Sequence, residues 1–326
     1  MKKDDSDTTE LLAKLTPWLE NFVPFIGLPK TMKKFSVGQS NPTYELKTTQ
    51  GCYVVRTQPA GPLLKSAHAV DREFRVMKAL YNSAVPVPAM IAECHDTEII
   101  GRKFFVMEKI NGITVFDPAL PTFTPSDRAH LYRSKVNILA AMAMLDPLTI
   151  GLENYGRPSG YLDRQISTWT RQYRASQTDD LADMEFLITH LSEALNSHMP
   201  GLCVIHGDFR LDNMLLQNEI KILALIDWEL STLGPAFIDL SYWCAMLRMD
   251  ANWPIGGLGG IQRTQLGIPN ECDLVQQFCA ETGYQKPPNW EALVAFQCFR
   301  FSSILQGVRK RDLDGNASAS NATAVG

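Results

Sequence analysis

The sequence has no surplus of positive charge and no long apolar run. Thirty-one Lys and Arg residues stand against 35 Asp and Glu residues, which gives a formal net charge of −4. A chain without a basic surplus cannot neutralise a long run of phosphates, so we expect no dedicated binding of DNA or RNA. No apolar run approaches the roughly 18 residues of a membrane span, and the acidic, polar N-terminus is unlike a secretory signal. The sequence therefore predicts a cytoplasmic protein with no membrane segment.

Cysteines are few and show no pairing pattern. The seven cysteines are odd in number, scattered, and include no Cys-x-x-Cys pair. This argues against a disulfide framework or a zinc site and indicates reduced thiols. What the chain does have is an ordinary globular composition, with 45% hydrophobic and 20% charged residues over 326 positions. That length suits two domains or one large two-lobed unit.

The first half of the chain alternates between strand-like runs and turns. Turn residues separate the apolar stretches, and prolines end one helical stripe. From this pattern we expect strands around 35–37, 44–47, 53–57, 90–94 and 103–109, and helices over 9–22 and 67–82. Asn111 and Gly112 then open a loop rich in Pro and Thr. We place the lobe boundary there, which predicts lobes of residues 1–110 and 111–326.

The second half is mostly helical. Its periodicity predicts helices over 127–146, 161–176, 179–198, 236–249, 270–282 and 290–308. A short β-rich insert interrupts them, with strands at 202–205, 213–216 and 222–226. A β-rich lobe with one main helix, followed by a helical lobe, is an α+β arrangement. We expect a ligand in the cleft between two such lobes.

One cluster of polar residues carries the chemical signal. An apolar strand delivers His206 and Asp208 into a loop, Asn213 begins the next strand, and a third apolar strand ends in Asp227. Phosphoryl transfer needs a carboxylate to orient and deprotonate the attacking hydroxyl, together with oxygen ligands for Mg²⁺. Asp208 fits the first role, and Asn213 and Asp227 fit the second. Alternatively, His206 and Asp208 are ligands of a metal hydrolase, although the other histidines show no spacing that completes such a site.

The pattern His-Gly-Asp-x₄-Asn followed by Ile-Asp-Trp-Glu resembles the catalytic core of the aminoglycoside phosphotransferase and choline kinase superfamily, relatives of protein kinases. The resemblance covers about residues 30–315. It implies a protein-kinase-like, two-lobed α+β fold, and transfer of phosphate from ATP with Mg²⁺ to a small-molecule hydroxyl. It also implies catalytic roles for His206, Asp208 and Asn213, with Asn213 and Asp227 as metal ligands. Asp239 matches a family aspartate that braces the catalytic loop.

The same resemblance assigns a nucleotide site to the first half. Its implied contacts lie in a loop, a strand, a helix and a hinge: Ser40, Asn41, Arg56, Glu73, Met107, Glu108 and Ile110. Met107 would close the back of the adenine pocket, and backbone groups of Glu108 and Ile110 would bond adenine. Glu73 would pair with the basic residue of the third strand.

That basic residue is a departure from the family pattern. Arg56 stands where many relatives have lysine. A guanidinium is permanently charged and can bond a phosphate or Glu73 in a fork, so nucleotide anchoring can survive the change. Its geometry differs from that of an ammonium, however, and a nucleotide-binding pseudokinase or scaffold is therefore an alternative to an active kinase.

Flanking segments narrow the subgroup. Residues 35–44, 66–76 and 307–317 are similar to stand-alone bacterial phosphotransferases and to the kinase-like domain fused to certain animal acyl-CoA dehydrogenases. This resemblance implies a metabolic kinase, with the hydroxyl of a hydroxyacyl-CoA as one candidate acceptor. An aminoglycoside-type or choline-type kinase is the alternative. The sequence indicates no oligomeric state.

A final expectation concerns the acceptor itself. The stripe over 290–308 carries Phe296, Phe299 and Phe301, and the cations Arg309 to Arg311 follow it. Aromatic rings beside cations suit an apolar chain with an anionic head group better than an aminoglycoside. The alternative is that the rings belong to the core and the basic triplet is solvated.

Overall fold

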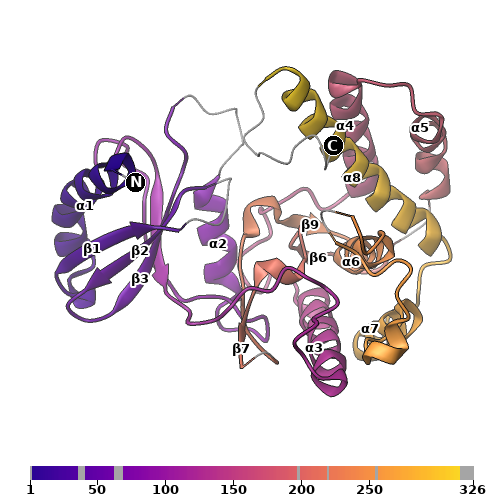
Figure 1. Cartoon of the computed structure of the whole chain (residues 1–326), viewed down its shortest axis with the longest axis horizontal. Coiled ribbons are helices and arrows are strands. Elements are labelled where there is room, and N and C mark those ends of the chain that lie inside the picture. The colour runs from indigo at the N-terminus through magenta and orange to yellow at the C-terminus, as the bar shows by residue number, and fades with distance from the viewer. Residues whose placement is uncertain are drawn as a thin grey trace. The chain divides into compact units, whose positions relative to one another are not determined.

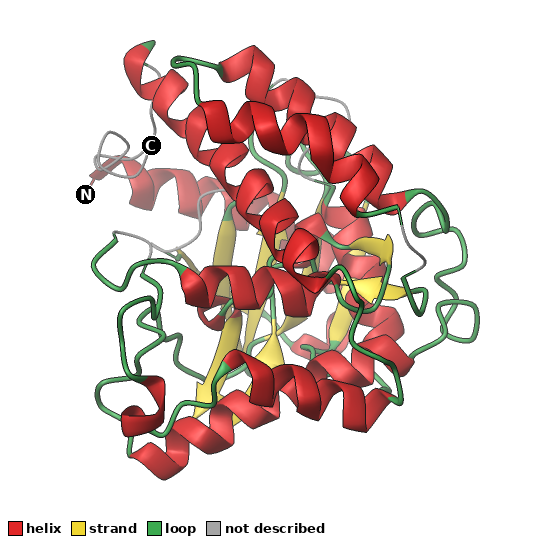
Figure 2. Ribbon diagram, turned by 90° about the vertical axis from the view of Figure 1, so that its right-hand side faces the viewer, coloured by secondary structure: helices red, strands yellow, loops and turns green. Residues whose placement is uncertain are grey.

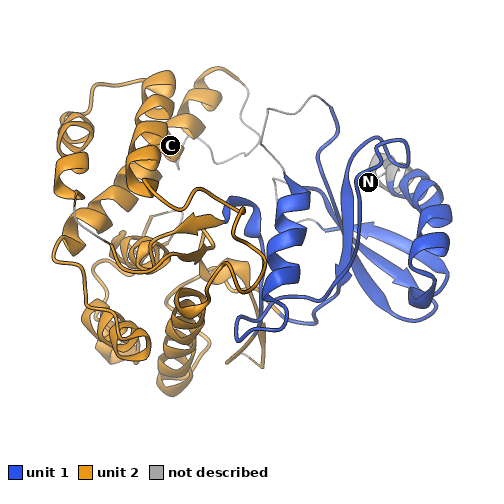
Figure 3. Ribbon diagram, turned by 180° about the vertical axis from the view of Figure 1, so that it is seen from behind, with its two compact units in different colours: residues 1–112, 223–231 blue, residues 113–222, 232–326 orange. Residues whose placement is uncertain are grey.

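The structure is a computed structural model, and it describes residues 2–35, 41–61, 69–196, 199–218, 220–253 and 256–315 (Figure 1). The chain divides into two compact units (Figure 3). Unit 1 comprises residues 1–112 and 223–231, and unit 2 comprises residues 113–222 and 232–326. The assignment of nucleotide binding to a lobe of residues 1–110 and of catalysis to residues 111–326 stays a prediction.

Unit 1 is built on a five-stranded antiparallel sheet. Its strand order is β1-β2-β3-β5-β4, and the strands are β1 (Pro29–Lys34), β2 (Thr43–Thr48), β3 (Cys52–Thr57), β4 (Met90–Cys94) and β5 (Phe104–Glu108). Helix α1 (Lys2–Phe22) packs on β1, and α2 (Val70–Leu80) packs on β4 and β5.

The two helices of unit 1 cover opposite faces of the sheet. Trp18 of α1 contacts Phe104 edge to face at 4.8 Å, whereas Phe74 of α2 lies 5.9 Å from Phe105. Successive side chains of a strand point to opposite faces of its sheet, so Phe104 of β5 faces α1 and Phe105 faces α2. This explains why Phe104, Phe105 and Val106 are all fully buried.

One expected strand of unit 1 is misplaced. We expected a strand at 35–37, but the first strand is β1, which ends at Lys34, and Phe35 lies outside any strand. In the sequence of β1, Met32 is the only buried residue, because β1 is an edge strand covered on one side by α1. Backbone groups pair β1 with β2, and the side chains of β1 show no alternating apolar pattern from which a strand could be predicted. Residues 36–37 lie outside the described residues.

Unit 2 is mainly helical (Figure 2). Its helices are α3 (Pro125–Met144), α4 (Tyr161–Ser176), α5 (Ala182–Ala194), α6 (Ile238–Arg248), α7 (Glu271–Thr282) and α8 (Trp290–Leu313). Helix α8 packs against α4, α5 and α6, and α3 packs against α6, α7 and β6 (Cys203–Ile205). Residues 238–247 of α6 are all buried, as befits a helix surrounded by other elements.

The strands of unit 2 are short. Strand β6 pairs antiparallel with β9 (Thr232–Gly234), which our sequence reading missed. Strand β7 (Met214–Gln217) follows the catalytic motif, and β8 (Lys221–Leu225) begins in unit 2 and ends in unit 1. These strands fix the chain on either side of the motif residues.

The structure bears on two further features of the sequence. All seven cysteines are free thiols, and Cys52 and Cys272 are the exposed ones. Within the described part of the chain, no helix is long and apolar enough to cross a membrane.

Candidate active site

The loop that follows β6 carries the predicted catalytic residues of unit 2. Asp239, in the first turn of α6, accepts hydrogen bonds from the backbone N–H groups of His206 (2.6 Å) and Gly207 (2.9 Å). Gly207 has φ +84°, a left-handed conformation that glycine adopts without steric cost. Asp239 therefore fixes the backbone from which Asp208 projects, as the family resemblance implied.

Asp208 is held at both carboxylate oxygens. Its Oδ1 accepts a hydrogen bond from the hydroxyl of Tyr242 at 2.6 Å, and its Oδ2 accepts one from Nδ2 of Asn213 at 3.0 Å. Burial alone would raise the pKa of Asp208, but the charge of Arg210 and these hydrogen bonds bring the pKa below its usual value. The carboxylate is therefore ionised at neutral pH and fixed in orientation.

His206 is buried beneath the loop. It has no exposed surface, and its Nδ1 accepts a hydrogen bond from the N–H of Asp208 at 3.2 Å. The ring also lies edge to face with Phe209 at 6.4 Å. These contacts give His206 a part in shaping the loop. Its direct participation in catalysis stays a prediction.

Asn213 presents one face to Asp208. Its Nδ2 donates to the carbonyl of Asp208 at 2.9 Å as well as to the carboxylate. Because the amide nitrogen is committed in this way, the amide oxygen is the group that Asn213 offers to a metal. Asparagine and aspartate oxygens are suitable ligands for Mg²⁺, so Asn213 in unit 2 and Asp227 in unit 1 each fit that ion chemically.

Asp227 follows the end of β8 by two residues and has a left-handed conformation. Its φ is +66° and its ψ is +56°, and such values are uncommon for residues other than glycine. About a third of its side chain is exposed (33%), and Oδ1 accepts a hydrogen bond from Nη2 of Arg56. Each carboxylate oxygen has two lone pairs, so this bond leaves Asp227 able to take a metal as well.

Arg56 links two acidic residues inside unit 1. Its Nε lies 2.7 Å from Oε2 of Glu73, while Nη2 contacts Asp227. The side chain of Arg56 is 12% exposed and that of Glu73 is 2% exposed. Burial raises the pKa of Glu73 to about 7, although Arg56 opposes this shift. The structure thus brings together Arg56, Glu73 and Asp227, three of the residues predicted to serve the nucleotide and its metal.

The predicted nucleotide loop is described in part. Ser40 lies outside the described residues. Asn41 is buried, and its Nδ2 donates to Oε2 of Glu229 at 3.1 Å. Glu229 comes two residues after Asp227, so the loop and the end of β8 meet within unit 1.

The predicted hinge follows β5. Met107 is buried (8% exposed) within β5, and its role as the back wall of an adenine pocket stays a prediction. The N–H of Glu108 donates to the carbonyl of Ala89 at 2.9 Å, so its own carbonyl is the group that it can offer to adenine. The carbonyl of Ile110 accepts a hydrogen bond from the N–H of Gly112 at 3.2 Å. The N–H of Ile110 is therefore the group that this residue can offer to adenine.

Three residues that sequence reasoning overlooked also contact Gly207 or Asp208 in the loop after β6. Arg210 lies 3.5 Å from Asp208 through its Nε, Tyr242 bonds the same carboxylate, and Nη2 of Arg300 donates to the carbonyl of Gly207 at 2.6 Å. Tyr242 follows Asp239 by three residues on α6, and such spacing places both on one helix face. That signal was available, whereas nothing in the sequence connects Arg300 with the loop.

The expected acceptor region on α8 has a different role. Phe296 and Phe299 have no exposed surface, and Phe301 is 7% exposed. Arg309 forms an ion pair with Asp179 at 3.3 Å. The first two rings are thus core residues of unit 2 and are unavailable to an acyl chain, as our alternative interpretation stated.

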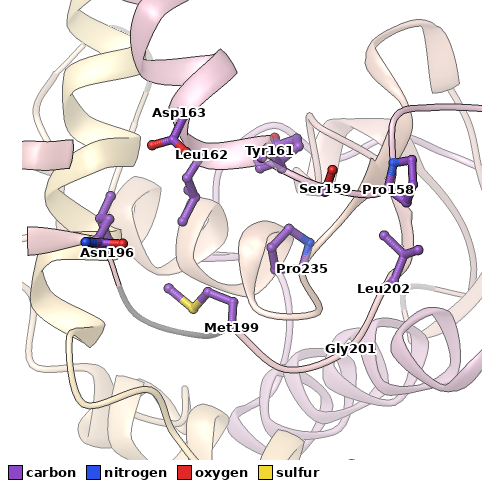
Figure 4. Close-up of a pocket in the computed structure, with 12 residues that line it drawn as sticks. Pro158, Ser159, Tyr161, Leu162, Asp163, Asn196, Met199, Gly201, Leu202 and Pro235 are labelled. Atoms are coloured by element: carbon purple, nitrogen blue, oxygen red, sulfur yellow. The ribbon is translucent and has the colours of Figure 1, made fainter. Parts of the chain in front are cut away.

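Unit 2 also contains a cavity of about 560 Å³ at the start of α4 (Figure 4). Tyr161 and Asp163 of α4, Met199, Leu202 and Pro235 are among the residues that line it. Leu202 directly precedes β6, and the catalytic loop follows the other end of that strand. The cavity includes none of the predicted site residues.

In the described part of the chain, no group of three or more His, Cys, Asp or Glu side chains is arranged to hold a metal ion. The metal hydrolase alternative, built on His206 and Asp208, therefore gains no third ligand of these types.

Comparison with known proteins matches the model of the phosphotransferase enzyme family to residues 31–269. Acyl-CoA dehydrogenase family member 10 of Mus musculus is 41% identical over 303 residues, which are 91% of this chain and 28% of the mouse protein. Member 11 of Homo sapiens is 36% identical and covers 96% of this chain. The chain spans only 28% and 40% of the length of these two dehydrogenase family members, respectively.

Solved structures share the fold. A candidate aminoglycoside phosphotransferase from Ralstonia eutropha JMP134 is 36% identical, with a TM-score of 0.86 and coverage of 96% of this chain and 93% of the other. An aminoglycoside phosphotransferase in a ternary complex with streptomycin and ATP has a TM-score of 0.55 at 15% identity, over 91% of this chain and 87% of the other. The α+β, protein-kinase-like fold predicted from the sequence is confirmed by these matches.

Proposed function

The chain belongs to the phosphotransferase enzyme family and is an ATP-dependent phosphotransferase, and from that premise we propose that it phosphorylates the hydroxyl of a hydroxyacyl-CoA. The observation that carries the phosphotransfer chemistry is the Asp208 carboxylate, which is ionised and held at both oxygens by Tyr242 and Asn213. We further propose a cytoplasmic location.

In this reaction Asp208 orients the acceptor. The hydroxyl donates a hydrogen bond to the Asp208 carboxylate, its oxygen forms a bond to the γ-phosphorus, and the bond from that phosphorus to the bridging oxygen of ADP breaks. The proton of the hydroxyl passes to the carboxylate. A low pKa makes Asp208 a weak base, which suits a loose transition state in which the hydroxyl loses its proton late.

The nucleotide would be held by residues of unit 1. Arg56 is fixed by Glu73 and presents a permanent charge to the phosphates, and the backbone of Glu108 and Ile110 would bond adenine. Mg²⁺, when held by Asn213 and Asp227, would neutralise charge on the phosphates.

The acyl-CoA part of the proposal is supported by the relatives. Members 10 and 11 of the acyl-CoA dehydrogenase family carry a region similar to nearly all of this chain, and most of their length lies outside it. A kinase region within a protein named for acyl-CoA chemistry would act most economically on the same class of molecule. The rings of α8 add no support, because Phe296 and Phe299 are buried in the core.

The proposal is tested by measuring ATP turnover with three acceptors: a hydroxyacyl-CoA, kanamycin and choline. We expect the CoA ester alone to stimulate ADP formation and to acquire a phosphate by mass spectrometry. Asp208→Asn should lose turnover roughly 10²- to 10⁴-fold while keeping ATP affinity, because it removes the base and leaves the nucleotide contacts.

Each alternative function predicts a different result. Efficient phosphorylation of kanamycin or choline would replace the acyl-CoA acceptor with that class. Tight ATP binding without phosphate transfer to any of the three would favour the pseudokinase. Equal losses of binding and turnover in Asp208→Asn would show that Asp208 is a structural residue.

A further inference from the structure

A tyrosine outside the sequence motif bonds the proposed base. The hydroxyl of Tyr242 lies 2.6 Å from Oδ1 of Asp208, and the tyrosine is 4% exposed. Burial raises the pKa of Tyr242 far above its usual value, so at neutral pH the hydroxyl keeps its proton and donates. A donor in such a short bond to a charged acceptor makes one of the stronger types of protein hydrogen bond.

We propose that Tyr242 is a positioning residue, which holds the Asp208 carboxylate in the one orientation that receives the acceptor hydroxyl. The proposal deepens the proposed function and rests on it. Tyr242 bonds Oδ1 while Asn213 bonds Oδ2, so the carboxylate cannot rotate without breaking one of the two. The proton of the acceptor hydroxyl can therefore go only to carboxylate lone pairs that Tyr242 and Asn213 leave free.

Helix α6 supplies one residue that holds the backbone before Asp208 and one that holds the Asp208 side chain. Asp239 and Tyr242 lie three residues apart on α6. The first binds the backbone N–H groups that precede Asp208, and the second binds its side chain. Because α6 is buried along nearly its whole length, it is a rigid support for this pair.

Helix α8 supports the tyrosine from another side. The guanidinium of Arg300 lies 5.1 Å from the centre of the Tyr242 ring and 5.5 Å from that of Trp169 on α4. The same Arg300 donates to the carbonyl of Gly207. Gly207 is thus bonded at its N–H by Asp239 and at its carbonyl by Arg300. Tyr242 therefore sits in a frame that already fixes the loop.

Several other charged or titratable groups surround this carboxylate and its frame. They come from the loop, α6, α8 and α3, and they are His206, Arg210, Asp212, Asp239, Arg300 and Lys135. Exchanging Tyr242 for Phe leaves all of these groups in place. A change of kcat in that variant would therefore report the loss of the hydroxyl.

The experiment compares Tyr242→Phe with Tyr132→Phe. Tyr132 is a matched control, since it is 2% exposed, belongs to the same unit, and donates its hydroxyl to the carbonyl of Pro118 at 2.8 Å. We expect Tyr242→Phe to lower kcat about 10- to 100-fold at neutral pH, as a misplaced reacting group does, with the KM for ATP unchanged.

Tyr132→Phe should lose thermal stability to a similar degree but keep the wild-type kcat. A purely structural role for Tyr242 predicts that kcat falls no more in Tyr242→Phe than in Tyr132→Phe, or that the KM for ATP rises as kcat falls, and either result would overturn the proposal. If Tyr242→Phe unfolds, 3-fluorotyrosine at position 242 keeps the ring and the donor. It should keep the wild-type kcat, and a loss as large as that expected of Tyr242→Phe would count against the proposal.

A second measurement separates this inference from the proposed function. Crystal structures of the two variants need no turnover, and the Asp208 carboxylate should leave its wild-type orientation in Tyr242→Phe and keep it in Tyr132→Phe. If the wild type phosphorylates no acceptor but the carboxylate reorients in Tyr242→Phe, the proposed function fails and the hydrogen bond to Asp208 stands. If the wild type is active but neither kcat nor the orientation of the carboxylate changes, the positioning role fails.

Discussion

At the scale of single residues, Arg56 explains how this chain differs from a lysine-bearing relative. A lysine ammonium is a point charge, whereas the guanidinium fork reaches Glu73 with Nε and Asp227 with Nη2 at the same time. Arg56, the predicted phosphate anchor, thus contacts its predicted partner Glu73 and also Asp227, a predicted metal ligand. Burial disfavours its charge, but Glu73, Asp227 and Glu229 together raise the pKa of Arg56.

This bridge predicts a specific pattern of stability. Arg56→Met should destabilise the protein by about 3–5 kcal/mol, because it removes one partner of a buried ion pair and leaves the carboxyl group of Glu73 buried without it. Arg56→Met combined with Glu73→Gln should recover most of that loss. Chemical denaturation of the single and double variants measures the coupling. Simple additivity of the two single changes would contradict a direct interaction between these side chains.

At the scale of elements, the helices with a clear apolar stripe were predicted well. Helix α4 was expected at 161–176 and lies at Tyr161–Ser176. The edge strand β1 and the three-residue β9 were not predicted correctly, because backbone pairing and not side-chain pattern defines them. The fold class therefore followed from periodicity, while the short pairings depended on contacts between distant segments.

The residues of the candidate site also divide into those that a local motif predicted and those that depend on contacts between distant segments. Asp208 and Asn213 were identified because one short loop holds both, and a local motif records that closeness. Tyr242 and Arg300 were missed because folding, and not sequence proximity, brings α6 and α8 to the loop. Arg56 and Asp227 were each predicted, but their direct contact was not, since 171 positions separate them.

Helix α3 carries a buried cation that supports another prediction. Lys135 is 2% exposed, and its Nζ lies 4.2 Å from the ring centre of Trp243 and 5.3 Å from that of Phe209. Burial lowers the pKa of Lys135 to about 7. The unfolded chain therefore binds more protons at this site between about pH 7 and pH 10, and the free energy of unfolding rises with pH in that window.

Lys135→Met removes the titrating group and fills similar space. We expect it to raise the free energy of unfolding at pH 7 by about 1 kcal/mol or more, since replacing a buried charge with a packed apolar residue is often stabilising. The cation–π contacts offset part of this gain. The advantage should shrink toward pH 10, where the wild-type lysine is neutral. Parallel pH profiles of the two proteins would contradict a lowered pKa at Lys135.

At the scale of the whole molecule, ligand binding should raise the stability of the folded chain. Mg·ATP at about 100 times its Kd should stabilise the folded chain by about 2.7 kcal/mol through mass action. Asp227→Ala should abolish the metal-dependent part of the thermal shift, because it removes one proposed ligand. Asp208→Asn is the control, and its shift should match that of the wild type. A full shift in Asp227→Ala would exclude Asp227 as a metal ligand.

The division of the chain also affects how the protein is made. Unit 1 needs residues 223–231, which supply Asp227 and Glu229, although its other residues end at 112. A ribosome that adds about 5–20 residues per second takes roughly 6–24 s to synthesise the 119 residues from 113 to 231. During that interval Arg56 and Glu73 already exist, but two of their acidic neighbours do not. Unit 1 is therefore incomplete until residue 231 has been synthesised, well after the rest of its residues.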